Sequence, residues 1–371
     1  MLSTFFLFDR RLIIRFDVTL FFIALLIVGF GIFNLYSASV SAHAVGAVYK
    51  KQVYWFFIGL FLLFFGAFLN YSYLEQFGYF FYFFILLLLV LVLFQGKFIS
   101  GSRRWISLGL FNVQPSEFVK LSLIIVLAKW FKNKYDPRGL SLFSLLIPSF
   151  FSLIPFLLVF LQPDLGSALL LLLIFLSLVL FVRVGFRTLF VLCFCAFLFL
   201  PLSWNYLLKD YQKDRVIHFL DPSLDPLGKG YQVLQSKIAV GSGKFLGKGY
   251  LRGTQSQLNF VPEKYTDFVF SVFCEEWGFL GALVLGFLYL GLLFRFLFIA
   301  SAAKNSFGLI LGNGITALFF WQIIINIAMT LGLLPTVGIT LPLFSYGGSS
   351  LAVSLFCVGV MINIHIQKHI F

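Results

Sequence analysis

The stretch FSLLIPSFFSLIPFLLVFLQPDLGSALLLLLIFLSLVLFV, residues 143–182, sets the fold class of this chain. It is apolar almost throughout, and its clearest turn signal is the segment Gln162–Gly166, which holds a proline, an aspartate and a glycine. A membrane-spanning helix needs about 20 predominantly apolar residues. The stretch therefore predicts two membrane-spanning helices, at 143–162 and 165–182, rather than one helix of twice that length.

The rest of the chain has the same character. Of its 371 residues, 61% are hydrophobic, 20% aromatic and only 11% charged, whereas soluble domains carry about 25% charged residues. This composition excludes a water-soluble domain, a disordered protein and a disulfide-rich secreted module. We therefore predict one all-α polytopic membrane domain over residues 1–371, with ten transmembrane helices at 18–38, 53–70, 78–95, 115–131, 143–162, 165–182, 188–207, 270–299, 308–331 and 349–366.

An even number of spans places both termini on one side of the membrane. The predicted short connections on that side hold more lysines and arginines than those on the other side, so the positive-inside rule makes it the cytoplasmic side. The net charge of +13 fits this topology and contact with anionic lipid. We expect no nucleic-acid partner.

The longest predicted connection, residues 208–269 between helices seven and eight, faces outward in this topology. It holds nine of the 27 basic and six of the 14 acidic residues. A long loop in a compact protein is usually either functional or disordered. Residues 230–240 have helical apolar spacing and several glycines follow them, so we expect an interfacial helix and tight turns.

Ionisable residues within the predicted spans are candidates for function because they are costly in lipid. Glu117 and Lys120 are three residues apart and can pair on one helix face; a structural ion pair that locks two helices is the alternative. Asp164 lies between spans five and six, where it is either a functional acid or the N-cap of span six. Glu275 and Glu276 fall in the first turns of span eight, where the helix dipole favours carboxylates.

Asp267 precedes span eight, and apolar residues follow it at once. A carboxylate at such a boundary is partly desolvated, which raises its pKa and makes it a better proton acceptor. An N-cap of the helix is the alternative role. Glu263 shares a face with Asp267 if this segment is helical, and the two acids could then hold a divalent cation; otherwise Glu263 is simply solvated beside Lys264.

Several common sites are excluded. The glycine–lysine pairs at 243–244 and 247–248 fit no Walker A register, so we expect no nucleotide. The four histidines form no cluster in the sequence, and the four cysteines lie in apolar runs without metal-ligand spacing. The segment Ser345–Ser350 has no histidine nearby and is interpreted as a turn where a span begins.

Four stretches of the sequence match a known family. GSRRWISLGLFNVQPSEFVK (101–120), LQPDLGSA (161–168), residues 219–281 with NFVPEKYTDF, and GLLPTVGITLPLFSYGGSS (332–350) closely resemble the SEDS family of shape, elongation, division and sporulation proteins. The segment GTQSQL (253–258) resembles the RodA branch rather than the FtsW division branch. These motifs are long and spread over nearly the whole chain, so the resemblance is specific.

The resemblance implies a ten-helix peptidoglycan glycosyltransferase in the cytoplasmic (inner) membrane of a bacterium. Its active site would face outward and polymerise lipid II during cell elongation and rod-shape maintenance. The implied partners are a class B penicillin-binding protein, which crosslinks the strands, and other membrane proteins of the elongation complex.

The same resemblance assigns roles by position. Asp267 falls on the essential aspartate of the family, Glu117 and Lys120 fall on the acid and the lysine of the Q-P-S-E-F-x-K motif, and Asp164 falls on the aspartate of the Q-P-D-L-G motif. Tyr265 departs from the pattern, because a histidine is common at that position. This departure weakens a mechanism in which the histidine relays a proton, but it leaves the aspartate in place.

The implied reaction joins two lipid II molecules: the 4-hydroxyl of an acceptor N-acetylglucosamine attacks the anomeric carbon of a donor N-acetylmuramic acid, and undecaprenyl diphosphate leaves. A base must accept the hydroxyl proton, and positive charge must stabilise the leaving diphosphate. We expect Asp267 to be the base. Lys120, Arg103, Arg104 and cations of the long loop are expected near the diphosphate, together with Mg²⁺ or Mn²⁺, for which Asp267 and Glu263 are the possible ligands.

Two other functions are compatible with the sequence. A lipid II flippase needs ionisable groups along a path through the midplane, whereas the charges here gather towards the outer ends of the predicted spans, which favours an outward-facing enzyme. A non-catalytic scaffold of the wall-synthesis complex would tolerate replacement of Asp267.

Overall fold

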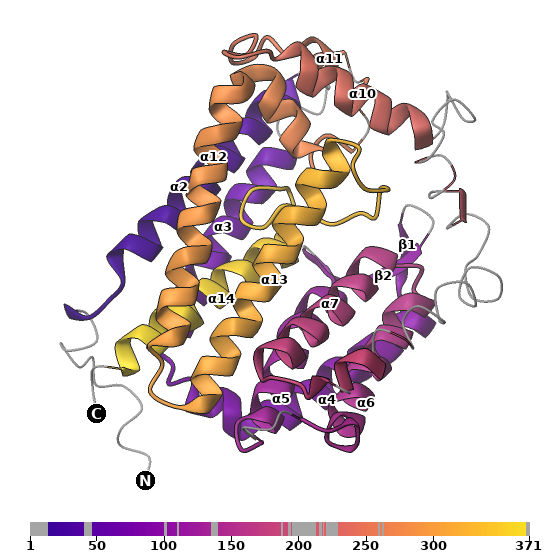
Figure 1. Cartoon of the computed structure of the whole chain (residues 1–371). Coiled ribbons are helices and arrows are strands. Elements are labelled where there is room, and N and C mark those ends of the chain that lie inside the picture. Colours follow the sequence, from indigo (N-terminus) through magenta and orange to yellow (C-terminus); the bar gives the residue numbers. More distant parts are fainter. Residues whose placement is uncertain are drawn as a thin grey trace.

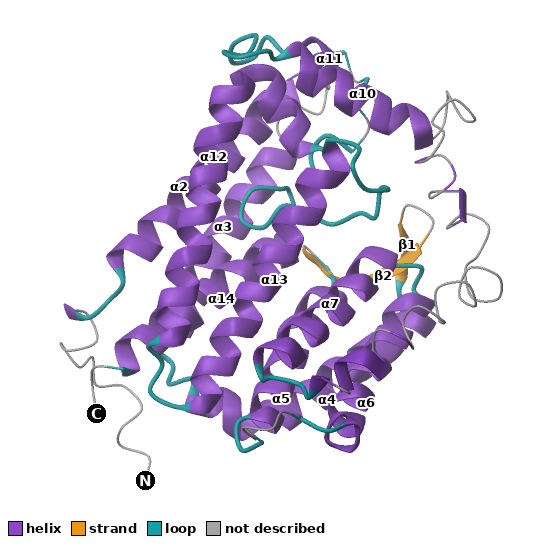
Figure 2. Cartoon of the chain, in the orientation of Figure 1, coloured by secondary structure: helices purple, strands orange, loops and turns teal. Residues whose placement is uncertain are grey.

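The chain folds into a bundle of long helices (Figures 1 and 2). This computed structural model describes residues 14–40, 47–99, 102–109, 111–134, 140–186, 188–191, 194, 213–214, 217, 219, 229–258, 260–261 and 263–368. Its helices are α2 (Val18–Val40), α3 (Ala47–Phe68), α4 (Ser72–Gln95), α5 (Pro115–Phe131), α6 (Leu142–Leu161), α7 (Leu165–Phe181), α10 (Lys229–Ser242), α11 (Thr254–Gln257), α12 (Val269–Ser301), α13 (Ser306–Thr330) and α14 (Gly348–Gln367).

Helices cover nine of the ten predicted spans. Within the described residues, seven helices are long and apolar enough to cross a membrane; α7 is apolar but has only 17 residues, and α5 has 17 residues of which three are charged. The predicted span at 188–207 and the first part of the predicted long loop lie mostly outside the described residues. The predicted helix at 230–240 is confirmed as α10, which lies at one end of the bundle (Figure 1).

The helices form two groups in Figure 1. Helices α4, α5, α6 and α7 lie together, and α2, α3, α12, α13 and α14 form the other group. Helix α14 packs closely on α3, because a Cβ at Gly359 would lie only 2.1 Å from the carbonyl oxygen of Leu63. Glycine at such a contact lets two helix backbones approach. The groups meet where α13 and α14 contact α5, and where α13 contacts α7.

The prediction of an all-α fold omitted a small antiparallel sheet between α4 and α5. Its strands are β1 (Lys97–Ile99), β2 (Ser102–Leu108) and β3 (Phe111–Val113), in the order β1-β2-β3. In the register of β2 with β3, Ile106 pairs with Val113 and Leu108 with Phe111. The strands are short and bear charged residues, so they carried no long alternating pattern. The sheet places Arg104 beside the helix bundle.

The sequence predicted one uninterrupted span at 270–299, but helix α12 is broken within that range. Gly278 has φ +64° and ψ −162°, which no helix contains, and the chain reverses there. We call residues 269–277 the short arm of α12 and residues 279–301 the long arm. In Figure 1 the α12 ribbon turns over at the end of the bundle that carries α10 and α11.

Contacts with α2 show the reversal. The side chain of Asn34 donates to the Val269 carbonyl at 3.1 Å, and Ser37, further along α2, donates to Glu276, so the short arm runs in the same direction as α2. Arg295, in the long arm, donates to the Oδ2 of Asp17 at 2.8 Å, at the start of α2. The long arm therefore runs in the opposite direction.

The segment that follows α10 stabilises the reversal. The amides of Lys248 and Gly249 donate to the carbonyls of Glu275 and Glu276, each at 3.0 Å. Beyond the break, the amide of Phe279 donates to the Lys244 carbonyl at 2.9 Å and that of Leu280 to Phe245 at 3.1 Å. Backbone groups that lose their helical partners at Gly278 thus regain partners from residues 244–249, as buried backbone groups require.

The reversal changes where Asp267 lies. The sequence predicted it at the outer mouth of span eight, but it precedes the short arm, which begins level with Asn34. That residue lies six positions before the end of α2, or about 9 Å along the helix axis. Asp267 therefore lies below the α10 end of the bundle, inside the protein rather than at its rim.

Candidate functional site

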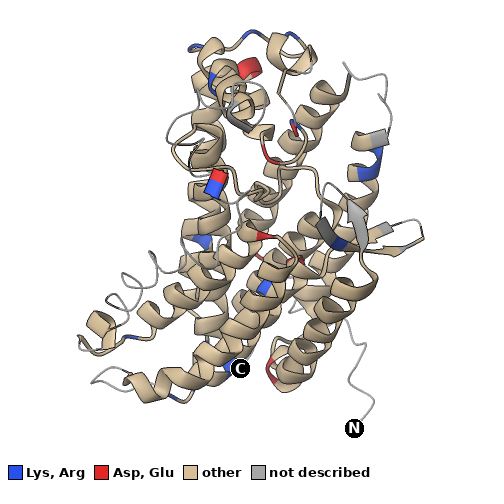
Figure 3. Cartoon of the chain, turned by 90° about the vertical axis from the view of Figure 1, so that its right-hand side faces the viewer, with Lys and Arg blue, Asp and Glu red and all other residues tan. Residues whose placement is uncertain are grey.

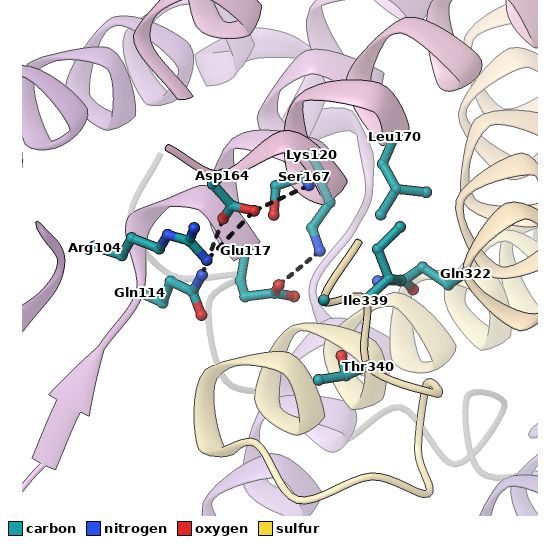
Figure 4. Close-up of a pocket in the computed structure, with 11 residues that line it drawn as sticks. Arg104, Gln114, Glu117, Lys120, Asp164, Ser167, Leu170, Gln322, Ile339 and Thr340 are labelled. Carbon is teal, nitrogen blue, oxygen red and sulfur yellow. Dashed lines mark hydrogen bonds and ion pairs between the residues drawn. The ribbon is translucent and has the colours of Figure 1, made fainter. Parts of the chain in front are cut away.

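A polar cavity lies where the two groups of helices meet (Figure 4). It has a volume of about 50 Å³, enough for a few water molecules. Its lining comes from β2, α5 and α7 on one side and from α13 and the α13–α14 connection on the other: Arg104, Gln114, Glu117, Lys120, Asp164, Ser167, Leu170, Gln322, Gly338, Ile339 and Thr340. Charged residues, blue and red in Figure 3, are sparse along the helices, whose ribbons are mostly tan.

The predicted pair Glu117–Lys120 is confirmed. Pro115 begins α5, so both residues lie in its first two turns, and the ammonium of Lys120 donates to the Oε1 of Glu117 at 2.7 Å. Both side chains are nearly inaccessible, with 10% of Glu117 and 2% of Lys120 exposed. A buried ion pair of this kind is strong only while both partners are present. It places one positive and one negative group on the cavity wall.

Of the two roles that the sequence left open for Asp164, the N-cap of α7 is confirmed, and the functional role stays a prediction. It caps α7, because its Oδ1 accepts from the amide of Ser167 at 3.2 Å. Its carboxylate also lies 3.8 Å from a terminal nitrogen of Arg104, and its Oδ2 accepts from the Gln114 side chain at 3.5 Å. Arg104 in turn donates to the carbonyls of Gln162 and Pro163.

The connection between α13 and α14 joins Asp267 to the cavity. Gly338 lines the cavity, and a Cβ at Gly338, whose φ is +76°, would lie 3.6 Å from the Oδ2 of Asp267. The half-buried Asp267 carboxylate therefore lies directly beside the cavity wall. Four of the residues predicted from the sequence, Arg104, Glu117, Lys120 and Asp164, surround the same space.

Of the remaining predicted residues, Glu263 is not brought into the described cavity lining, and nothing is seen of the Arg103 side chain. Glu263 is exposed, with φ +51°, in a turn rather than a helix, and its carboxylate accepts from the Thr266 hydroxyl at 3.2 Å. The condition for a shared helix face with Asp267 is therefore not met. Arg103 lies in β2, but its side chain is outside the described part of the structure.

The described residues contain no group of three or more His, Cys, Asp or Glu side chains that could hold a metal ion. A Mg²⁺ ion needs fewer protein ligands when substrate phosphates coordinate it, since it commonly binds one or two carboxylates and keeps several waters. Asp267, which is half-buried beside the cavity, fits such an ion as a partner of a substrate diphosphate, whereas Glu263 is exposed in a turn and does not meet the condition for a shared site.

Lys264 was not singled out from the sequence, and it is buried. Only 3% of the residue is exposed, and its ammonium donates to the Ser256 carbonyl at 2.6 Å. Burial lowers its pKa to about 8 because removal from water disfavours the charged form. The bond attaches the turn before Asp267 to α11.

Glu275 and Glu276 lie in the short arm and are buried, at 0% and 1% exposure. Glu275 accepts from Lys248 at 2.7 Å and from the amides of Gln255 at 2.9 Å and Ser256 at 3.2 Å. This carboxylate attaches α11 to α12. The helix-dipole explanation from the sequence is therefore wrong, because Glu275 and Glu276 lie in the last turn of the short arm, just before the break at Gly278, and Glu275 is held by these hydrogen bonds instead.

Sequence reasoning missed several cavity residues. Gln114, Ser167 and Thr340 stand inside the quoted motifs, so position in the motif was the available signal. Gln322 is a buried amide in the middle of α13, and a polar side chain within an apolar span is itself a signal for function.

Comparison with known proteins extends these observations. The family model for cell cycle proteins of the FtsW, RodA and SpoVE type matches residues 17–370. The chain is 41% identical over 273 residues to the peptidoglycan glycosyltransferase MrdB of Escherichia coli K12, which covers 74% of this chain and 73% of that one. It is 36% identical over 369 residues to the MrdB of Helicobacter pylori 26695, with 98% and 93% covered.

Solved structures agree with the sequence comparisons. A chain of a peptidoglycan synthase complex that coordinates polymerization and crosslinking superposes with a TM-score of 0.82, at 36% identity, over 96% of this chain and 99% of the other. The rod shape determining protein RodA of Thermus thermophilus superposes with a TM-score of 0.71, at 31% identity, over 95% and 98%.

Proposed function

Because the chain belongs to the family of FtsW, RodA and SpoVE cell cycle proteins, we infer that it is a peptidoglycan glycosyltransferase of the RodA branch, an integral membrane enzyme. Relatives that carry this activity in their names cover most of the chain. The substrate is lipid II, which the enzyme joins into glycan strands. The observation that carries the assignment of the site is the position of Asp267 beside the polar cavity, 3.6 Å from the Cβ position of Gly338.

Asp267 acts as the general base. It accepts the proton of the acceptor 4-hydroxyl while the oxygen attacks the anomeric carbon of the donor, the new glycosidic C–O bond forms and the bond to the diphosphate breaks. A half-buried carboxylate is suited to this step because partial desolvation makes it a stronger proton acceptor than a solvated one. The short arm of α12 keeps the carboxylate inside the protein.

Cations of the cavity stabilise the leaving diphosphate. Arg104 is 25% exposed at the cavity, and Lys120 lies deeper, paired with Glu117. Fixed positive groups aimed at a developing negative charge lower the barrier without reorganisation. The diphosphate end of the substrate approaches these groups.

A divalent ion, Mg²⁺ or Mn²⁺, would bind together with the substrate diphosphate, and on the protein side Asp267 would hold it. When bound, such an ion neutralises part of the leaving charge. No nucleotide takes part.

The enzyme works in the bacterial inner membrane with the α10 end outward, where lipid II is presented. A ten-helix topology with cytoplasmic termini and a connection at 208–269 on the outside agrees with the positive-inside rule. The likeness to a chain of a synthase complex that polymerises and crosslinks supports a class B penicillin-binding protein as the partner, with other elongation-complex membrane proteins around them.

The test uses purified wild type, Asp267→Ala and the isosteric Asp267→Asn, each folded and bound to its penicillin-binding partner. Each is supplied with lipid II and Mg²⁺ or Mn²⁺ in detergent, where no leaflet exists to be crossed. We expect glycan strands from the wild type and none from either variant. Chelation of the divalent ion is expected to lower the wild-type rate.

Other results would overturn the proposal in different ways. Equal strand formation by all three proteins would show that Asp267 is not the base. An absence of strands from a folded wild type with its partner would favour a lipid II flippase or a non-catalytic scaffold. Full wild-type activity after chelation would contradict only the proposed role of the divalent ion.

A further inference from the structure

The backbone of the turn that carries Asp267 is held from outside. The Tyr265 carbonyl accepts from the amide of Tyr346 at 2.9 Å, and the Thr266 carbonyl accepts from the Ser345 hydroxyl at 2.7 Å. Both donors belong to the α13–α14 connection, about 80 residues away in the sequence. Two consecutive peptide groups before Asp267 are therefore attached to the same segment that lines the cavity.

The next carbonyl, that of Asp267 itself, accepts from the side chain of Asn326 in α13 at 3.0 Å. The same Nδ2 atom donates to the Ile339 carbonyl at 2.7 Å. One amide thus joins the backbone of Asp267 to the backbone of a cavity-lining residue. Asn326 is completely buried, and its Oδ1 has no hydrogen-bond partner within the described residues.

That unpartnered oxygen bears on the role of Asn326. A buried acceptor without a partner lowers the stability of the folded protein by about 1–3 kcal/mol. An apolar side chain would fill the place of Asn326 without that cost. Its Nδ2 satisfies two carbonyls that would otherwise be unpaired. The geometry therefore indicates that Asn326 serves to connect the Asp267 and Ile339 carbonyls.

We propose that Asn326, assisted by Ser345, is a positioning residue that sets the place of the Asp267 carboxylate relative to the cavity. The inference rests on the proposed function of Asp267 and adds to it. Neither side chain is among the cavity-lining residues, so each acts through the backbone of the 265–267 turn. A displacement of about 1 Å at a reacting group can cost about 100-fold in rate.

The experiment compares Asn326→Leu, which has nearly the same size but no donor, with the wild type and its partner. We expect kcat for lipid II polymerisation to fall about 10- to 100-fold while KM changes less than about threefold, because substrate binding does not depend on the proton acceptor.

A second pair of variants covers the possibility that Asn326→Leu does not fold. Ser345→Ala removes the hydroxyl that holds Thr266, and Ser345→Thr keeps it. We expect kcat to fall for the alanine and to recover for the threonine. Thr330→Val is the matched control: it removes a buried hydroxyl one helical turn from Asn326 that, among the described residues, bonds within α13, to the Ile327 carbonyl at 2.8 Å, and should keep the wild-type kcat.

The two levels of the proposal fail differently. If Asp267→Ala polymerises lipid II like the wild type, the proposal that Asp267 is the general base is wrong. If Asp267→Ala is inactive while folded Asn326→Leu and Ser345→Ala keep the wild-type kcat, only the positioning role is overturned. An equal loss of kcat in Thr330→Val would also overturn it, because any damage to α13 would then suffice.

Discussion

The ammonium of Lys120 lies 2.7 Å from the Oε1 of Glu117, and only 2% of the lysine side chain is exposed. The pair is thus removed from water in the same cavity that Asp267 borders. A pair so deeply buried either stabilises the bundle, serves the reaction, or does both. Its energetic and its functional contributions can be separated experimentally.

Lys120→Met should lower the free energy of unfolding by about 3–5 kcal/mol, because the charge of Glu117 is then buried without its partner. The double variant Glu117→Gln/Lys120→Met should recover most of that loss, since no charge remains. Thermal unfolding in detergent measures both. We expect neither variant to polymerise lipid II at more than a few per cent of the wild-type rate. A stable double variant with full activity would make the pair purely architectural.

Substitution of Asp164 should separate its role as the N-cap of α7 from its proposed role in the reaction. Asparagine can still cap α7, so Asp164→Asn should keep the melting temperature, whereas Asp164→Ala should cost about 1 kcal/mol. Both variants remove the negative charge 3.8 Å from Arg104, and both should polymerise lipid II more slowly. Normal rates for the asparagine variant would leave Asp164 with the capping role alone.

Gly278→Ala should destabilise the protein by more than about 3 kcal/mol, because φ +64° is strained for alanine and the added Cβ would lie 2.3 Å from the Gly247 nitrogen. Gly286→Ala, in the long arm of the same helix, is the matched control. Nothing lies within 4 Å of its Cβ position, and alanine stabilises a helix interior by about 0.5–1 kcal/mol relative to glycine. Melting temperatures of the two variants measure the contrast. Similar values would show that the chain does not need the reversal.

Lys264 should give the stability a particular pH dependence. Burial lowers its pKa to about 8 in the folded chain, against 10.5 ordinarily. Between these values the unfolded chain binds a proton that the folded chain does not, so the free energy of unfolding rises with pH. At pH 7 the lysine is protonated in both states, and this burial penalty is fully present.

Lys264→Met should lack that rise. Unfolding measured from pH 7 to pH 10.5 for the two proteins gives a difference curve, in which groups that titrate alike in both cancel. A difference that stays constant over this range would contradict the lowered pKa of Lys264.

The sequence by itself determined the features that depend on neighbouring residues. Span length and apolar composition are local properties, and they identified helices such as α6 and α7 and the turn between them. The spacing of Glu117 and Lys120 places them on one helix face whatever surrounds the helix. An aspartate three residues before Ser167 can cap α7 by the same local logic.

Only the tertiary structure decided how these local pieces combine into a site. The reversal at Gly278 depends on backbone partners from residues 244–249, and the hydropathy of 270–299 contains no trace of it. Likewise, Asn326 reaches Asp267 and Ile339 because the last turns of α13 lie beside the start of the short arm of α12. Hydrogen bonds between segments so distant in the chain are set by packing, which no local sequence pattern encodes.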